Sequence, residues 1–231
     1  MSGRGLPDLV IFDLAGTTVR DEGQVPNAFI AALGEHGIRA TAEEIAGVRG
    51  ASKREAIRRF FPDDQAGAGR AGAAYSAFQW RLREAYRPGR VLPIEGAEAT
   101  FAWLKDRGVR IALNTGFDRV VTDLLLEGLG WSAGIASAVV CGDDVSRGRP
   151  APDLIHRAMQ GCGVSDAENV ASVGDTVLDL LAGNEARVRY NIGVLSGAHD
   201  RARLETAPHT HLLESVRDLP ALFDAAWTSR R

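Results

Sequence analysis

Four short polar segments hold the side chains best suited to chemistry, and each follows or lies near a run of apolar residues. In chain order they are Asp13-Leu14-Ala15-Gly16-Thr17-Thr18, Asn114-Thr115-Gly116, Gly148-Arg149-Pro150-Ala151-Pro152-Asp153 and Gly174-Asp175-Thr176, with Asp179 close behind. Carboxylates, hydroxyls and an arginine can supply a nucleophile, hydrogen-bond donors and a fixed positive charge. Each segment alone is equally consistent with a helix cap or a helix start. Their significance depends on whether the fold brings them together.

Two of these carboxylates, Asp175 and Asp179, are spaced for a metal. Residues four apart lie on the same face of a helix, so both carboxylates would point the same way. Like charges that close need a cation between them. Oxygen ligands suit Mg²⁺, which binds through a few carboxylates together with substrate phosphate oxygens. The spacing therefore predicts a magnesium site.

Hydrophobic patterning indicates the elements that must position these segments. Short runs that are mostly apolar occur at residues 9–12, 109–113, 137–141, 170–173 and 192–195. Helical patterns fall between them, at residues 95–106, 120–129, 154–161 and 177–186. Such runs are typical of strands buried on both faces, and their alternation with helices predicts a parallel, Rossmann-like α/β sheet. Ligands bind these sheets at the carboxyl ends of the strands, where the polar segments lie.

One long stretch interrupts this alternation. It holds only helical patterns, at residues 27–35, 42–46, 53–60 and 75–86, and a Gly/Ala-rich part at residues 66–74 that predicts no element. We therefore expect a helical insertion over residues 20–92, within a core made of residues 1–19 and 93–231. Asp21 and Glu22 lie in the loop that enters the insertion, where a solvated turn is favoured over a hinge or a substrate contact.

Composition excludes several classes of protein. The 231 residues suffice for one large domain, or for a core with a modest insertion. With 45% hydrophobic and 25% charged residues, the chain has the composition of an ordinary globular protein. Its formal net charge of -3 argues against a general nucleic-acid or anionic-membrane binder, because such proteins need a basic surface. Any anionic ligand must be held by a local positive site.

The cysteines and histidines indicate no further site. Cys141 and Cys162 lack the number and spacing of a disulfide framework or a zinc site, so we expect both to be buried. His209 and His211 favour a surface pair over a metal site. The N-terminus has no apolar run of signal-peptide length, and nowhere do 18 apolar residues occur together, which predicts a cytoplasmic protein without a membrane partner.

Taken together and in this order, the four polar segments resemble the four motifs of the haloacid dehalogenase superfamily. The helical insertion sits where that family carries its cap, and the resemblance covers essentially the whole chain. It implies that Asp13 is the nucleophile, Thr115 a hydroxyl donor to the transferred group and Arg149 the cation on that group. It implies a Mg²⁺ site at Asp13, Ala15, Asp175 and Asp179, and contacts to the phosphoryl group from Gly16, Thr17 and Gly116. The implied partner is a small phosphorylated or phosphonate metabolite, bound by a monomer or a homodimer.

Ala15 departs from the usual motif of this superfamily and indicates which branch the chain resembles. Phosphatases of this superfamily usually carry a second aspartate at that position, which protonates the leaving alkoxide. The pattern D-x-A-G-T-T, with Arg149 where many relatives have lysine, resembles the phosphonatase (phosphonoacetaldehyde hydrolase) branch. That branch cleaves a carbon–phosphorus bond after a cap lysine forms a Schiff base with the aldehyde. The carbon then leaves as an enamine, so no acid is needed.

Lys53 is the matching cap lysine. It follows Gly50-Ala51-Ser52 and opens a helix, and burial near other cations would supply the neutral amine that Schiff-base chemistry requires. The alternative is a solvated lysine at a helix start. Two positions depart from the phosphonatase cap, because Arg49 replaces a methionine and Ala56 replaces a histidine.

We therefore expect a Mg²⁺-dependent hydrolase that forms an aspartyl-phosphate and cleaves a carbon–phosphorus bond. One alternative is a phosphate-monoester phosphatase of the same superfamily. Another is a non-catalytic protein that binds a phospho-ligand, although the retained carboxylates argue against it. Dehalogenation of L-2-haloacids is disfavoured, because that branch lacks the two-carboxylate metal site.

Overall fold

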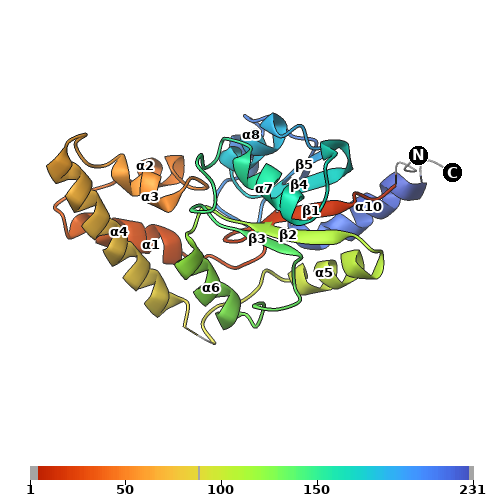
Figure 1. Cartoon of the computed structure of the whole chain (residues 1–231), viewed down its shortest axis with the longest axis horizontal. Coiled ribbons are helices and arrows are strands. Elements are labelled where there is room, and N and C mark those ends of the chain that lie inside the picture. Colours follow the sequence, from red (N-terminus) through yellow and green to blue (C-terminus); the bar gives the residue numbers. More distant parts are fainter. Residues whose placement is uncertain (1–4, 88, 229–231) are drawn as a thin grey trace.

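The computed structural model describes residues 5–87 and 89–228, and its centre is a parallel β-sheet (Figure 1). The sheet has six strands in the order β3-β2-β1-β4-β5-β6. The strands are β1 (Leu9–Asp13), β2 (Arg110–Asn114), β3 (Ala138–Val140), β4 (Val170–Gly174), β5 (Tyr190–Val194) and β6 (His211–Leu213). All pairings are parallel. The prediction of a Rossmann-like α/β core is confirmed.

Helices cover both faces of the sheet. They are α5 (Ala97–Asp106), α6 (Arg119–Gly128), α7 (Asp153–Gly161), α8 (Val177–Glu185), α9 (Arg201–Leu204) and α10 (Leu219–Thr228), with short 3₁₀ turns at Ala167–Asn169 and Val216–Asp218. Successive side chains of a strand point to opposite faces. Val10 and Phe12 of β1 therefore pack on the side of α5 and α10, whereas Leu9 and Ile11 pack on the side of α7 and α8. Burial on both faces explains why these runs are apolar throughout.

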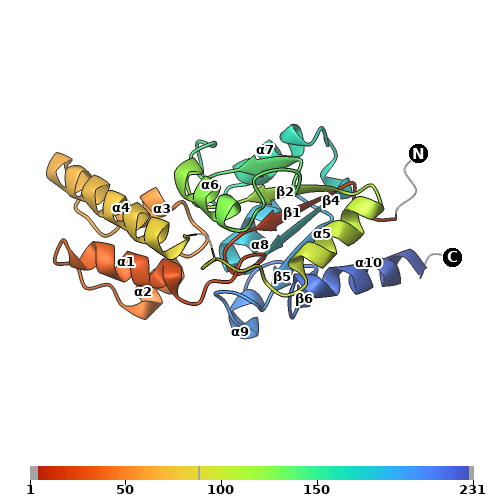
Figure 2. The same ribbon diagram turned by 90° about the horizontal axis from the view of Figure 1, so that it is seen from below.

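Four helices between β1 and β2 form a separate lobe next to the sheet (Figure 2). They are α1 (Gln24–Gly34), α2 (Ala42–Gly47), α3 (Lys53–Arg58) and α4 (Gln65–Ala85). The rings of Phe29 on α1 and Phe78 on α4 have centroids 4.7 Å apart in the centre of this lobe. A helical insertion is present, as expected. We call it the cap.

The Gly/Ala-rich residues 66–74 belong to α4, so this helix begins earlier than the sequence predicts. Asp64 caps its first turn by accepting a hydrogen bond from the backbone N–H of Gly67. Glycine weakens an isolated helix by about 1 kcal/mol per residue relative to alanine. Here Ala71 and Ala74 are buried against the other cap helices, and this packing outweighs the low propensity.

The two connections between cap and core lie side by side. Val19 and Pro93 form an antiparallel bridge. Arg20 N–H donates to the carbonyl of Leu92 at 2.9 Å, and Ile94 N–H donates to that of Thr18 at 2.8 Å. The chain thus enters and leaves the cap through one point.

Other expectations concern single elements and residues. Cys141 and Cys162 are both buried and free, as expected. The predicted strand boundaries differ by one or two residues from those observed. The sequence analysis did not predict β6, where His211 lies, or helices α9 and α10. Within residues 5–87 and 89–228, no helix combines the length and apolarity needed to cross a bilayer.

Candidate active site

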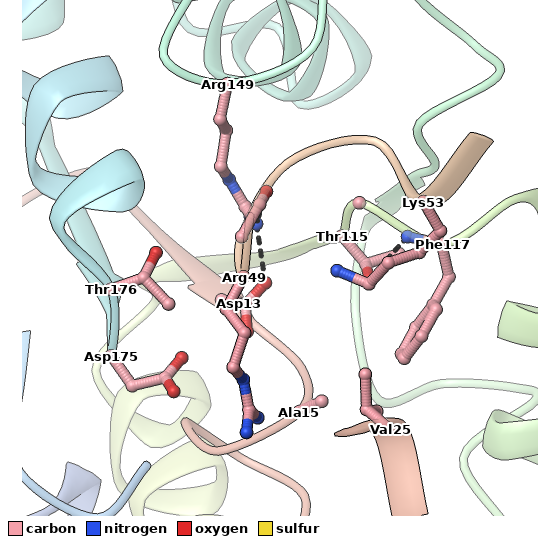
Figure 3. A pocket seen from close by; sticks show the side chains of 12 residues that line it. Asp13, Ala15, Val25, Arg49, Lys53, Thr115, Phe117, Arg149, Asp175 and Thr176 are labelled. Carbon is pink, nitrogen blue, oxygen red and sulfur yellow. Dashed lines mark hydrogen bonds and ion pairs between the residues drawn. The ribbon is translucent and has the colours of Figure 1, made fainter. Parts of the chain in front are cut away.

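The carboxyl ends of β1, β2 and β4 meet a loop of the cap around a nearly closed cavity (Figure 3). Its volume is about 20 Å³, which leaves room for roughly one water molecule. Charged and polar side chains dominate its walls. The lining residues are Asp13, Ala15, Val25, Arg49, Gly50, Lys53, Thr115, Gly116, Phe117, Arg149, Asp175 and Thr176. Residues predicted from all four polar segments and from the cap therefore share one cavity.

Asp13 ends β1 and is buried at the floor of this cavity. Its Oδ1 lies 2.9 Å from Nη1 of Arg149. Burial raises the pKa of Asp13 to about 7, with Asp179 and Asp175 adding to the rise and Arg149 opposing it. A buried carboxylate beside a fixed cation can serve as a nucleophile toward an anionic group, because the cation offsets the repulsion.

Arg149 is the cation predicted for the transferred group, and four residues hold its side chain, among them Gly50 of the cap, whose carbonyl accepts from Nη1 at 3.3 Å. Only 4% of the residue is exposed. Besides its contact with Asp13, its Nε lies 2.9 Å from Oδ1 of Asp179. Its Nη2 donates to Oδ1 of Asn114 at 2.7 Å, a contact that the sequence analysis did not assign. These contacts leave the guanidinium little freedom to move.

The helix that follows β4 does not carry both metal carboxylates on one face. Thr176 is the N-cap of α8, and Asp179 forms a capping box with it, so Asp175 precedes the helix. Asp175 instead accepts hydrogen bonds from the hydroxyl of Thr17 at 3.1 Å and from the N–H of Ala198 at 2.6 Å. The same-face prediction was therefore wrong. The cation that contacts Asp179 is a protein side chain, Arg149.

The remaining donors suit Mg²⁺. The carboxylates of Asp13 and Asp175 line the cavity with Ala15, which has only its backbone carbonyl to offer. Burial raises the pKa of Asp175 to about 6, and Asp179 adds to this, so a cation nearby would relieve an unfavourable charge. No three acidic, imidazole or thiol side chains converge on one point in the described part of the chain. Two carboxylates with backbone, water and substrate oxygens are nevertheless a usual set for Mg²⁺.

Two predicted phosphate contacts are not available. The N–H of Gly16 donates to the Val19 carbonyl at 2.7 Å, and that of Thr17 donates to the Leu14 carbonyl at 3.2 Å, so both are used within the loop. Gly16 has φ +96°, and a Cβ there would lie 2.3 Å from Oδ2 of Asp175. Its role is therefore to make room for that carboxylate.

The second polar segment does face the cavity. Thr115 Oγ1 accepts the N–H of Phe117 at 3.1 Å, which leaves its own O–H free to donate to a ligand. Gly116 lines the cavity, and a Cβ at this position would lie 2.4 Å from the Ala51 carbonyl oxygen of the cap. Glycine here lets cap and core approach closely.

Lys53 links the cap to this segment. It begins α3, and its backbone N–H donates to the Gly116 carbonyl at 3.1 Å. Only 7% of the residue is exposed, its Nζ donates to the Ala51 carbonyl at 3.2 Å, and the same Nζ lies 5.2 Å from the centroid of the Phe117 ring. The interpretation as a solvated lysine was wrong.

The surroundings of Lys53 favour the neutral amine. Burial lowers its pKa to about 8, which Asp13 opposes and which Arg49 and Arg149 reinforce. At pH 7, about a tenth of the amine is then neutral, against less than a thousandth at the ordinary lysine pKa. The cavity thus combines a buried carboxylate, that of Asp13, with an amine whose neutral form is accessible near neutral pH.

Arg49 is a cavity residue to which sequence reasoning gave no role of its own. Its Nη2 forms a short ion pair with Oδ2 of Asp21, whose side chain is only 2% exposed. The expectation of a solvated turn at Asp21 was therefore wrong. The signal available in the sequence was the position of Arg49, four residues before Lys53.

Comparisons with known proteins agree with this geometry. The family model of haloacid dehalogenase-like hydrolases matches residues 7–187. A phosphonoacetaldehyde hydrolase of Hahella chejuensis is 30% identical over 234 aligned residues, which cover 93% of this chain and 79% of the relative. A protein of the same name from Bacillus cereus is 28% identical over 215 residues, covering 88% of this chain and 81% of the relative.

Solved structures show the same fold. A phosphonoacetaldehyde hydrolase-like protein from Oleispira antarctica superposes with a TM-score of 0.84 at 21% identity, covering 97% of this chain and 94% of the other. A hydrolase from Pseudomonas syringae superposes with a TM-score of 0.83 at 24% identity, covering 94% of this chain and 97% of the other.

Proposed function

Because the chain belongs to the haloacid dehalogenase-like hydrolases, we propose that this enzyme hydrolyses the carbon–phosphorus bond of a small phosphonate whose β-carbon is a carbonyl. The cap over residues 20–92 would close on the core residues 1–19 and 93–231 during each turnover. One observation carries the proposal. Asp13 and the buried amine of Lys53 line the same cavity, whereas Ala15 offers no acid for an alkoxide leaving group.

Lys53 would begin the reaction by adding its neutral amine to the substrate carbonyl. A bond forms between nitrogen and the carbonyl carbon. The oxygen leaves as water, taking one proton from the amine and one from solvent, so the product is a protonated imine. This cation withdraws electrons from the neighbouring carbon–phosphorus bond.

Asp13 would then attack phosphorus through a carboxylate oxygen. The carbon–phosphorus bond breaks, its electron pair forms a carbon–carbon double bond, and the electron pair of the imine moves onto nitrogen. The products are an aspartyl-phosphate and an enamine on Lys53. Since no alkoxide forms at any point, alanine at position 15 costs the reaction nothing.

Water would complete both half-reactions. The enamine takes up a proton on carbon, and hydrolysis of the resulting imine frees Lys53 and the carbonyl product. A second water hydrolyses the aspartyl-phosphate and releases inorganic phosphate. Throughout, Arg149 and the Thr115 hydroxyl would bind the phosphoryl oxygens and stabilise the charge that builds up on them.

Asp13, Asp175 and the Ala15 carbonyl would hold Mg²⁺ against the same phosphoryl group. The ion supplies positive charge that screens the nucleophile from the dianion and stabilises the transition state. The acidic carboxylates around Asp13 make such a charge necessary, because Arg149 is shared with Asp179.

The direct experiment measures phosphate release from phosphonoacetaldehyde with Mg²⁺ present. Borohydride added during turnover should inactivate the enzyme and leave a reduced adduct on the peptide that contains Lys53. Lys53→Arg, which keeps the charge but stays protonated, should be inactive.

Asp13→Asn should lower the rate of phosphate release about 10³-fold or more while the protein remains folded. Excess EDTA should abolish turnover.

Contrary results would redirect the assignment. A Lys53→Arg enzyme that is active and insensitive to borohydride would make Lys53 an electrostatic contact and favour the monoester phosphatase. Undiminished turnover by folded Asp13→Asn would refute the aspartyl-phosphate.

A further inference from the structure

Arg49 is a cation in the cavity that the proposed reaction does not use. Asp13 attacks phosphorus, Lys53 binds the carbonyl and Arg149 binds the phosphoryl group. Arg49 lines the same cavity from the cap, and in the view of Figure 3 its guanidinium lies between Asp175 and Ala15. Its positive charge lowers the pKa of Lys53 and opposes the rise in the pKa of Asp175.

Asp21 fixes the position of Arg49. Oδ1 of Asp21 accepts the backbone N–H groups of Gly23 and Val25, both at 3.2 Å, which locks the carboxylate at the start of α1. Oδ2 then pairs with Nη2 of Arg49. A guanidinium has five N–H donors in a rigid fork, and this contact engages one nitrogen. The others remain for a ligand, and 17% of the Arg49 side chain is exposed.

The hydroxyl of Tyr86 is a second polar group that the described residues leave unpaired. Tyr86 is 3% exposed, and its buried hydroxyl has no hydrogen-bond partner among the described residues. Its ring packs edge-on against Phe117 of the cavity wall, with centroids 6.3 Å apart. Burial raises the pKa of Tyr86, and the charges that act most strongly on the hydroxyl are those of Asp21 and Arg49. Tyr86 is not among the residues that line the cavity, but it packs on Phe117 of the cavity wall, so its unpaired hydroxyl is available to an anionic ligand that Arg49 binds.

We propose that Arg49, with the Tyr86 hydroxyl beside it, binds a carboxylate carried by the substrate. The substrate class is then a phosphonate in which the carbonyl next to the phosphonate-bearing carbon also carries a carboxylate, that is, a phosphono-α-keto acid. The inference rests on the proposed function and adds the identity of the group on the far side of the carbonyl.

The positive charges that line the cavity suit this substrate class. A phosphono-α-keto acid carries a phosphonate, a carbonyl and a carboxylate on successive carbons. Arg149 would take the first, Lys53 the second and Arg49 the third. Arg49 lies in the loop of residues 48–52 that leads into α3, and Lys53 is the first residue of that helix, so both reach the cavity from one segment of the cap. An aldehyde substrate would leave the Arg49 subsite without a partner group.

The test compares two pairs of compounds, each differing in a carboxylate. 3-Phosphonopyruvate and phosphonoacetaldehyde share the carbon–phosphorus bond, and 2-phosphoglycolate and ethyl phosphate share a phosphate ester. For each pair, the ratio of kcat/KM for the acid to that for its partner measures carboxylate recognition. The wild type should prefer the acid, and Arg49→Met should lower the ratio about 100-fold through loss of a charge-assisted contact. Arg49→Lys should fall between the two.

Each result decides the matter. If Arg49 only holds the cap in place through Asp21, Arg49→Met should lower kcat/KM equally for both compounds of a pair. An unchanged ratio in Arg49→Met therefore overturns the inference. A wild type that prefers phosphonoacetaldehyde to 3-phosphonopyruvate overturns it while the proposed function stands. If only the phosphate esters are hydrolysed, the proposed cleavage of a carbon–phosphorus bond is wrong. The ratio of kcat/KM for 2-phosphoglycolate to that for ethyl phosphate then shows whether Arg49 binds a carboxylate. Arg49→Lys, which keeps the charge opposite Asp21, serves if Arg49→Met does not fold.

Discussion

Single side chains in this cavity have more than one task, and Arg149 is the clearest case. It neutralises Asp13 and Asp179 at once, and Asn114 orients it. A buried cation with two anionic partners matters for folding as well as for binding, because its removal leaves charges that have no access to water.

Arg149→Ala should therefore lower the free energy of unfolding by about 3–5 kcal/mol and also suppress phosphate release. Urea denaturation followed by circular dichroism measures the first effect. Arg147→Ala is the matched control, because that arginine pairs with Asp153 at the surface and should have little effect on either quantity. An Arg149→Ala protein as stable as wild type would contradict the role of Arg149 as the buried counter-charge.

The pH dependence of turnover follows from Lys53. In the proposed reaction the amine attacks only when neutral, and its pKa of about 8 means that the neutral fraction falls about tenfold for each pH unit below that value. We expect kcat/KM for the keto-phosphonate to rise with pH and level off near 8. Arg49→Met removes a positive charge that lowers this pKa, so the rising limb should move to higher pH.

Arg54→Met is the control for that shift. Arg54 follows Lys53 in the sequence but lies over the Tyr75 ring, 4.5 Å from its centroid, and is not among the charges that act on Lys53. Its removal should leave the pH profile in place. Equal shifts in both variants would mean that Arg49 does not act locally.

The candidate site residues could be predicted from the sequence better than the contacts that they make. Asp13, Thr115, Arg149 and Lys53 were predicted as site residues and all line one cavity, because strand ends and a helix start are readable from short patterns. The pair of Arg49 with Asp21 spans 28 positions, so it depends on how the cap helices pack. No local spacing predicts such a contact.

At the scale of elements, the successes and failures have the same origin. Strands buried on both faces leave continuous apolar runs, and β1 to β5 were predicted from them. β6 is a three-residue edge strand that is only half-buried and contains His211, so it leaves no such run. Helix α4 was predicted too short because its first turns consist of small residues that only tertiary packing holds in a helix.

The contact between the cap loop and α8 depends on a glycine. Gly50 has φ +87°, and a Cβ there would lie 2.4 Å from Oγ1 of Thr176. Gly50→Ala should therefore hold the cap loop away from the core and lower kcat/KM by about tenfold or more, since small displacements of catalytic groups are costly. Steady-state kinetics and a thermal melt measure this.

Gly37→Ala separates sterics from backbone strain. Gly37 also has positive φ, at +75°, but nothing lies within 4 Å of its added Cβ. In both variants the free energy of unfolding should fall by a similar amount, about 1 kcal/mol. Only Gly50→Ala should lower kcat/KM. Equal kinetic losses would contradict the role of Gly50 in cap closure.

At the scale of the whole molecule, the structure represents a closed state. The cavity of about 20 Å³ is too small for a substrate, so the cap must open for entry and exit. One contact that opposes opening is made by Tyr75 and Gln79 of α4, which both donate to Oδ2 of Asp118 at the start of α6.

Tyr75→Phe should shift the molecule toward the open state. A hydrogen bond to a charged acceptor contributes about 1.5–3 kcal/mol, so its loss should lower kcat/KM for the proposed substrate by about tenfold or more. Small-angle X-ray scattering should show a larger radius of gyration without ligand. Ser76→Ala on the same helix, whose hydroxyl contacts only the Gly72 carbonyl at 3.2 Å, should change neither. Identical scattering from Tyr75→Phe and wild type would mean that the contact does not control closure.

The bridge between Val19 and Pro93 makes the cap an exchangeable cassette. Since the chain leaves the core and returns to it at one paired point, residues 21–91 can be cut out and replaced by the cap of a relative without altering any strand of the sheet. A chimaera of this kind would keep Asp13 and Arg149 from this chain and take its lysine loop from the donor. We expect the substrate preference of such a chimaera to follow the donor cap.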